Sequence, residues 1–172
     1  MAELTNRVAQ SGLRTIDLED FYPKHPLAEF DLKDYLFQGL VLREKDFRAA
    51  LAQHNWIQYT GKTLLVYCSN DAILPAWAPM LVASYALPFA EDVFAGDLMM
   101  YLEDSFRRTI RQMDTTDLED ARVVIKGCSS SIVPPGAYVE LVRKLQPVVR
   151  TLMFGEPCST VPVYKKKGGG EG

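Results

Sequence analysis

The segment from Tyr67 to Pro75, with the sequence YCSNDAILP, has a near-copy in the segment from Gly127 to Pro134, GCSSSIVP. Each segment follows a short apolar run, Thr63–Tyr67 in the first case and Arg122–Lys126 in the second. Each also precedes a stretch with apolar residues at helical spacing, and a proline fits the first turn of a helix because its missing N–H has no partner to lose there. Both copies are therefore typical of a strand, a polar loop and a helix.

The similarity extends beyond the two loops. When one loop residue is dropped, the copies match at an offset of 59 residues, which pairs positions 73, 75, 78, 88 and 96 with 132, 134, 137, 147 and 155. A short strand, a glycine and an acidic residue follow the helix in both copies. We therefore predict an internally duplicated βαβ unit, with repeats over about residues 62–97 and 122–156.

Apolar runs of strand length alternate with helical patterns along most of the chain. This alternation predicts an α/β fold with a mostly parallel sheet, because parallel neighbours need helical crossovers. We expect a single domain over residues 1–164, followed by a disordered lysine- and glycine-rich tail at 165–172. The predicted strands are 37–42, 63–67, 92–95, 122–126 and 151–154, and the predicted helices are 43–54, 75–89, 97–113 and 134–149.

The composition limits the classes of partner. The chain has 172 residues, 48% of them apolar and 24% charged, and a net charge of −3, so no general attraction to nucleic acid or to an anionic membrane is expected. The longest apolar stretch, residues 72–90, holds three prolines and is expected to be a buried helix instead of a membrane span. A helix that is apolar nearly all round is buried in a core or in an interface, which predicts a homo-oligomer.

The three cysteines carry the most specific functional hypothesis. Cys68, Cys128 and Cys158 each follow a predicted strand, and the carboxyl ends of parallel strands meet at the edge where open α/β proteins bind ligands. Three thiolates and one further donor would form a zinc or iron site. The sequence does not identify the fourth metal ligand, for which the candidates are His25, His54, Asp71 and water.

Other interpretations of the cysteines stay open. Cys128 or Cys68 could be the nucleophile of a transferase or redox enzyme, because a thiolate is stabilised at a helix N-terminus. Free cysteine is also an ordinary small core residue. The odd number of cysteines and the absence of a signal peptide pattern in residues 1–10 indicate a reducing cytoplasm and no disulfide framework.

Polar residues next to two of the cysteines predict a small-ligand or anion site. The residues concerned are Ser69, Asn70 and Asp71 in the first loop and Ser129 and Ser130 in the second. Their hydroxyls and amides precede predicted helices and could hold a ligand there, or they could simply cap the helices. A third alternative is a homodimeric interaction module without chemistry, which uses the apolar helix 75–89 as its contact surface.

Several longer motifs resemble a bacterial family of proteins of unknown function. They are NRVAQSGL at 6–13, DLEDFYP at 17–23, LFQGL at 36–40, CSNDAILP at 68–75 and FGEPCSTVP at 154–162. The resemblance covers the chain from about residue 6 to residue 166. It implies a full-length, single-domain, cytoplasmic protein, and it carries no activity, cofactor or catalytic residue over to this chain.

Overall fold

The structure is a computed structural model that describes residues 12–127, 132–156 and 159–167. Its contacts divide the chain into two compact units, each with its own core. Unit 1 comprises Met1–Tyr22 and Leu102–Gly172, and unit 2 comprises Pro23–Tyr101.

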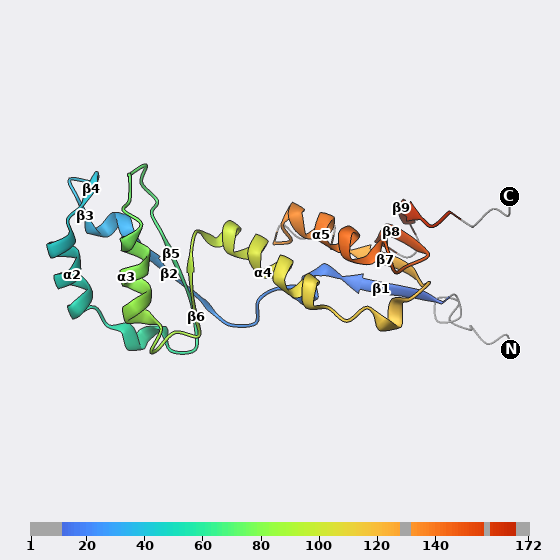
Figure 1. The fold of residues 1–172 in the computed structure, drawn as a ribbon, viewed down its shortest axis with the longest axis horizontal. Helices are drawn as coiled ribbons and strands as arrows, with labels where there is room; N and C mark the ends of the chain where they lie inside the picture. Colours follow the sequence, from blue (N-terminus) through green and yellow to red (C-terminus); the bar gives the residue numbers. More distant parts are fainter. Residues whose placement is uncertain (1–11, 128–131, 157–158, 168–172) are drawn as a thin grey trace, which may run out of the picture. The chain divides into compact units, whose positions relative to one another are not determined.

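Unit 2 contains a three-stranded parallel sheet in the order β2-β5-β6, formed by Leu27–Asp31, Thr63–Tyr67 and Asp92–Ala95. Helices α2 (Glu44–Gln53) and α3 (Trp77–Ala86) lie on the same side of this sheet (Figure 1). Their apolar stripes pack against the sheet face that carries Leu64 and Val66. The buried core consists of Phe30, Leu32, Leu42, Phe47, Leu51, Trp56, Tyr59, Leu64, Val66, Ala78, Val82 and Ala86.

Unit 1 contains a four-stranded sheet in the order β1-β7-β8-β9, formed by Leu13–Asp17, Arg122–Lys126, Thr151–Glu156 and Ser159–Lys165. The first three strands are parallel, whereas β9 runs antiparallel to β8 with a register shift at Leu152/Met153 and Pro162 opposite Met153. Helices α4 (Leu98–Gln112) and α5 (Pro135–Leu145) contribute to its core. The buried core consists of Leu18, Leu102, Phe106, Ile110, Val123, Ile125, Val133, Ala137, Leu141, Leu145, Val149 and Leu152.

The predicted α/β class with mostly parallel strands is confirmed, but the parallel strands form two sheets instead of one. Each central strand, β5 or β7, pairs on one side with the second strand of its own βαβ unit, which is β6 or β8. On its other side it pairs with a strand from the N-terminal segment, which is β2 or β1. Strands β1 and β2, which provide these second neighbours, were not predicted. They are short edge strands with mixed exposure, so their sequences lack the continuous apolar run of a buried parallel strand.

Both predicted repeats fold as βαβ units with the same register. Thr63 pairs with Asp92, and the residues 59 positions further on, Arg122 and Thr151, also pair. The backbone N–H of residue 91 donates to the carbonyl of residue 62 over 2.9 Å, and that of residue 150 donates to the carbonyl of residue 121 over 2.8 Å. Upstream, α2 and α4 end at equivalent positions, 53 and 112. The repeats therefore adopt the same local fold, while their origin by duplication stays a prediction.

Two predicted boundaries were wrong. The expected strand 37–42 is a hairpin of β3 (Leu36–Phe37) and β4 (Val41–Leu42), because Gln38 and Gly39 adopt φ angles of 52° and 71° and turn the chain. The expected tail at 165–172 begins too early. Lys165 belongs to β9, and the N–H of Lys166 donates to the carbonyl of Arg150 over 2.8 Å.

Four short 3-10 helices complete the described elements. They are η1 (Leu18–Phe21), η2 (Leu32–Tyr35), η3 (Trp56–Tyr59) and η4 (Thr116–Leu118). The first two follow β1 and β2 directly, and each has an aspartate at its N-cap position, Asp17 or Asp31, whose carboxylate accepts from the backbone N–H two residues later over 3.0 Å. Each aspartate therefore fixes the turn that ends its strand.

Gly155 permits the close pairing of β8 with β9, so we expect Gly155→Ala to destabilise unit 1. Its φ of 122° suits only glycine, and an added Cβ would lie 2.6 Å from the backbone oxygen of Ser159. The expected loss of unfolding free energy is about 1–3 kcal/mol, measured by chemical denaturation. Val161→Ala, an exposed change on β9, should cost less than about 0.5 kcal/mol. Equal stability of G155A and the wild type would contradict this account.

Candidate functional site

The three predicted metal ligands do not follow strands of one sheet. Cys68 follows β5 in the sheet of unit 2, whereas Cys128 and Cys158 follow β7 and β8 of unit 1 in sequence and lie outside the described residues. Cys68 is half-buried and packs against the core of unit 2, which matches the interpretation as a core residue. Within the described ranges, no group of three or more His, Cys, Asp or Glu side chains could hold a metal ion.

His54, one candidate for the fourth metal donor, lies in an aromatic cluster of unit 2. Its Nε2 atom is 2.9 Å from the hydroxyl of Tyr59, and the two rings stack with centroids 5.6 Å apart. Its ring also contacts Phe30 edge-on and Trp56. Burial lowers the pKa of His54, because the surrounding rings disfavour its charged form. The lowered pKa therefore favours the neutral imidazole, which packs against the aromatic rings around it.

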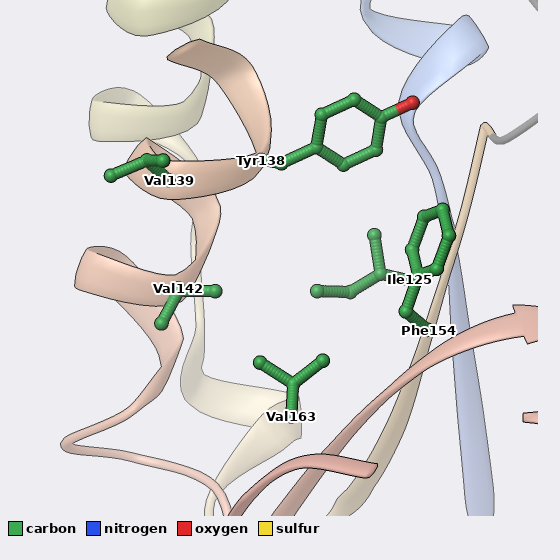
Figure 2. A pocket seen from close by; sticks show the side chains of 6 residues that line it. All are labelled: Ile125, Tyr138, Val139, Val142, Phe154 and Val163. Atoms are coloured by element: carbon green, nitrogen blue, oxygen red, sulfur yellow. The ribbon is translucent and has the colours of Figure 1, made fainter. Parts of the chain in front are cut away.

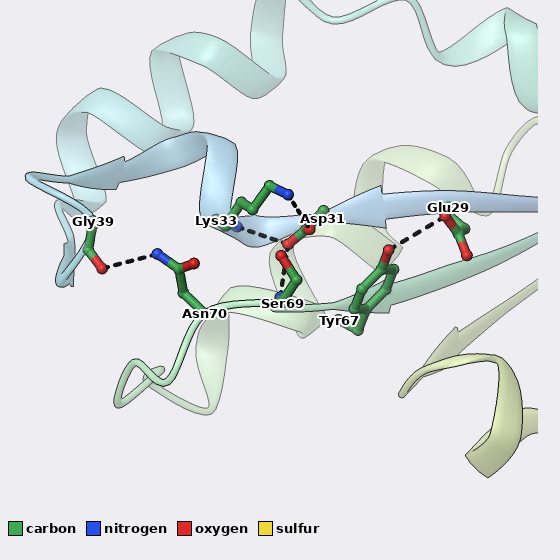
Figure 3. A network of polar contacts seen from close by, with 7 residues as sticks. All are labelled: Glu29, Asp31, Lys33, Gly39, Tyr67, Ser69 and Asn70. Carbon is green, nitrogen blue, oxygen red and sulfur yellow. Dashed lines mark hydrogen bonds and ion pairs between the residues drawn. The ribbon is translucent and has the colours of Figure 1, made fainter.

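Two of the three predicted ligand-binding residues of unit 2, Ser69 and Asn70, belong to a polar network at the carboxyl ends of β2 and β5 (Figure 3). Asp31 Oδ1 accepts from the backbone N–H of Lys33 and of Ser69, each over 3.0 Å, and the Lys33 Nζ lies 3.4 Å from Asp31 Oδ2. Partial desolvation raises the pKa of Asp31, but hydrogen bonds from Ser69 and Lys33 outweigh it and hold the pKa below its ordinary value. The network therefore ties the loop after β5 to the end of β2.

Asn70 and Tyr67 extend this network. The Asn70 side-chain amide donates to the carbonyl of Gly39 over 3.3 Å, which joins the loop to the β3–β4 hairpin, and the Tyr67 hydroxyl donates to Glu29. Asp71 is exposed. The loop does not cap α3, because that helix has Ala76 at its N-cap position and no side-chain cap. Ser69 and Asn70 thus have internal partners, and their role in ligand binding stays a prediction, as does that of Ser129 and Ser130 outside the described residues.

Unit 1 has an apolar pocket of about 310 Å³ between α5 and the sheet (Figure 2). Among the described lining side chains, Tyr138 alone carries a polar atom, and its hydroxyl donates to the carbonyl of Gly127. The volume lies at the lower end of the usual range for small-molecule sites. The pocket is lined by Ile125 from β7, Phe154 from β8, Val163 from β9, and Tyr138, Val139 and Val142 from α5.

The aromatic wall of the pocket depends on a glycine. Tyr138 and Phe154 meet edge to face with centroids 5.6 Å apart. Gly127 follows β7 with a φ of 123°, and a Cβ on it would lie 3.3 Å from the Tyr138 hydroxyl oxygen. The glycine therefore leaves room for Tyr138 to reach the backbone at the carboxyl end of β7.

The pocket adjoins the sheet edge where a ligand site was expected, although its lining residues were not predicted. Ile125 pairs with Phe154 in the carboxyl halves of two parallel strands. Sequence reasoning missed Val163 because β9 was not predicted. It could have found Val139, because this apolar residue lies outside the apolar stripe predicted for its helix. In the structure Val139 is 60% exposed.

A second hollow in unit 1, of about 430 Å³, has a polar lining. Two of its lining residues, Asp120 and Lys166, are paired: the Lys166 Nζ lies 3.9 Å from Asp120 Oδ1, and the Nε of nearby Arg150 lies 3.1 Å from Asp120 Oδ2. A hydrogen bond from Arg150 and its positive charge lower the pKa of Asp120. This arrangement is an ion-pair cluster at the start of the sheet, and Glu119 also lines the hollow beside it.

We expect Asp31→Ala to destabilise unit 2 by about 1–2 kcal/mol, because the N–H groups of Lys33 and Ser69 lose their acceptor. The matched control is Asp34→Ala, an exposed aspartate in the same 3-10 helix, which should cost less than about 0.5 kcal/mol. Chemical denaturation measures both changes. A D31A variant as stable as D34A would show that the network does not support the fold.

The lowered pKa of His54 predicts that unit 2 loses stability on acidification. Below about pH 6.5 the unfolded chain takes up a proton on this histidine more readily than the folded chain does, so stability falls until the pH passes the lower folded pKa. His54→Gln, which cannot titrate, should weaken the decrease in melting temperature between about pH 7 and pH 5. His25→Gln removes an exposed histidine and serves as the control. An unchanged pH dependence in H54Q would contradict the prediction.

No helix in the described part of the chain combines the length and the apolar character needed to cross a bilayer.

Comparisons with known proteins identify a family but no activity. No curated protein and no solved structure gives a significant match to the chain. A family model described as protein of unknown function (DUF2480) matches residues 2–166. Since this match spans nearly the whole chain, the protein belongs to the DUF2480 family, as the sequence motifs indicated.

Proposed function

We propose that the protein binds a small molecule through the apolar pocket of unit 1. The observation that supports this function is a pocket of about 310 Å³ whose described lining is apolar apart from one tyrosine hydroxyl with an internal partner. Such pockets are the usual sites for small molecules, and this one lies beside the carboxyl ends of parallel strands.

The pocket keeps apolar side chains in contact with water when no ligand is bound. Val139 is 60% exposed and Val163 is 48% exposed, and they lie on two different elements that flank the pocket. Covering such side chains with an apolar group removes their surface from water, which favours binding by roughly 25 cal/mol per Å². An apolar ligand would therefore bind without needing a polar partner inside the pocket.

The lining selects the chemical class of the ligand. An acyl chain or an aromatic ring fits a pocket without free hydrogen-bonding groups, whereas a charged group would lose its hydration there without compensation. A polar end of the ligand would lie outside the pocket, towards solvent. Cys128, Ser129, Ser130 and Cys158 lie outside the described residues, and their part in ligand binding stays a prediction. The zinc or iron site stays a prediction that elemental analysis of the purified protein can check.

Titration with octanoate and butyrate tests the proposal. Each buried CH₂ contributes about 0.8 kcal/mol, so octanoate should bind more tightly than butyrate. Methyl NMR should show saturable shifts at Ile125, Val142 and Val163, which surround the pocket (Figure 2). Shifts that do not saturate, or equal affinity for both acids, would contradict the proposal.

A matched pair of variants tests the location. Val163→Trp fills the pocket and should weaken octanoate binding by about tenfold or more, equivalent to 1.4 kcal/mol. Val41→Trp adds the same ring at an exposed valine on β4 of unit 2, outside the pocket lining, and should change the affinity less than about twofold. Equal effects of the two variants on the affinity would show that octanoate binds outside this pocket.

A further inference from the structure

Helix α3 of unit 2 has an outward face without charge. Met80 is 71% exposed and Leu87 is 56% exposed, and both lie on the same stripe as the exposed Ala76 and Ser84. Residues 72–90 contain no Asp, Glu, Lys or Arg. The opposite face of the helix is buried through Ala78, Val82 and Ala86. A surface helix normally carries charged residues on its solvent side, so this face differs from an ordinary solvated one.

Helix α5 provides an internal comparison, because it has the same place in the other βαβ unit. The positions that correspond to Ser84 and Leu87, 59 residues further on, hold Arg143 and Gln146. Arg143 and Arg111 both pair with the carboxylate of Glu140, Arg111 over 2.8 Å. The same backbone position is therefore compatible with an ordinary charged surface, and the uncharged face of α3 needs another explanation.

We propose that the outward face of α3 binds the same face of a second copy of the chain. A two-fold interface brings a patch against itself, so any charge in it would meet or approach a like charge unless it were paired. The α3 face carries no charge and satisfies this condition. Partners of different sequence gain specificity from charge complementarity, which this face does not offer. Depletion of charge, with methionine in the contact, is also typical of interface centres.

Exposed apolar side chains also flank α3 along the chain. Ile73, before the helix, is 97% exposed, and Phe89, after it, is 40% exposed. On the outward stripe the small residues Ala76 and Ser84 stand four positions to either side of Met80, so the helix of a second copy could approach this stripe closely, with its own Met80 against the small residues.

Light scattering and sedimentation of the full chain test this interface. We expect the wild type at about 100 μM to have twice the chain mass of 19.3 kDa, and Leu87→Lys to shift the protein to the monomer with at least tenfold weaker self-association. The control Gln146→Lys makes the same change at the corresponding position of α5 and should leave the mass unchanged. A monomeric wild type, or equal effects of L87K and Q146K, would overturn the proposal.

Mixing two variants separates self-association from binding to another protein. Met80→Lys and Met80→Glu should each be monomeric alone, because each places like charges at the contact, and they should form a dimer when mixed, because the charges then complement each other. Met80 is exposed, so both variants are expected to fold, which circular dichroism checks. Failure of the mixture to dimerise, with both variants folded, would overturn the proposal. This proposal does not rest on ligand binding in unit 1. Octanoate titration tests the pocket of unit 1, whereas the mass measurement tests self-association through α3 of unit 2, so each proposal can fail without the other.

Discussion

The burial of one central parallel strand in each unit is the constraint on which the rest of the structure depends. Strand β5 is buried from Thr63 to Val66, and β7 is buried from Val123 to Ile125. In both strands alternate side chains point to opposite faces, so neither face is free for solvent-exposed polar residues. Polar side chains are therefore confined to the strand ends. This explains why the polar network of Asp31 lies at the carboxyl ends of β2 and β5.

The same constraint determines what could be predicted from the sequence. Continuous apolar runs made β5 and β7 recognisable, and the helices that cover them followed from their 3.6-residue period. Edge strands β1 and β2 have no such run, and each has a strand neighbour on one side only. Without them the two central strands appeared to belong to one sheet. The expectation that all three cysteines share an edge depended on that single sheet.

The candidate site could be predicted only in part. The direction of the parallel strands predicted a site at their carboxyl ends, and Ser69 and Asn70 were selected by residue type; ligand binding by them stays a prediction. Their actual partners, Asp31 and Gly39, are separated from them by more than thirty positions in the sequence, and nothing local indicates these contacts. The pocket in unit 1 also depends on tertiary packing, because β9 reverses direction to bring Val163 opposite α5. Sequence patterns therefore predict helices and strands better than the pockets and tertiary contacts that form between them.

Strand β9 has a consequence for the solubility of unit 1. It pairs along the whole length of β8, so the backbone groups of β8 on that side cannot recruit a strand from another molecule. The outer side of β9 is itself a poor template for further pairing, since Pro162 lacks an N–H and Lys165 adds a charge at the end of the strand. The irregular register at Leu152/Met153 increases the local twist in the same region. This antiparallel strand therefore protects one edge of the sheet, the edge of β8, from edge-to-edge aggregation.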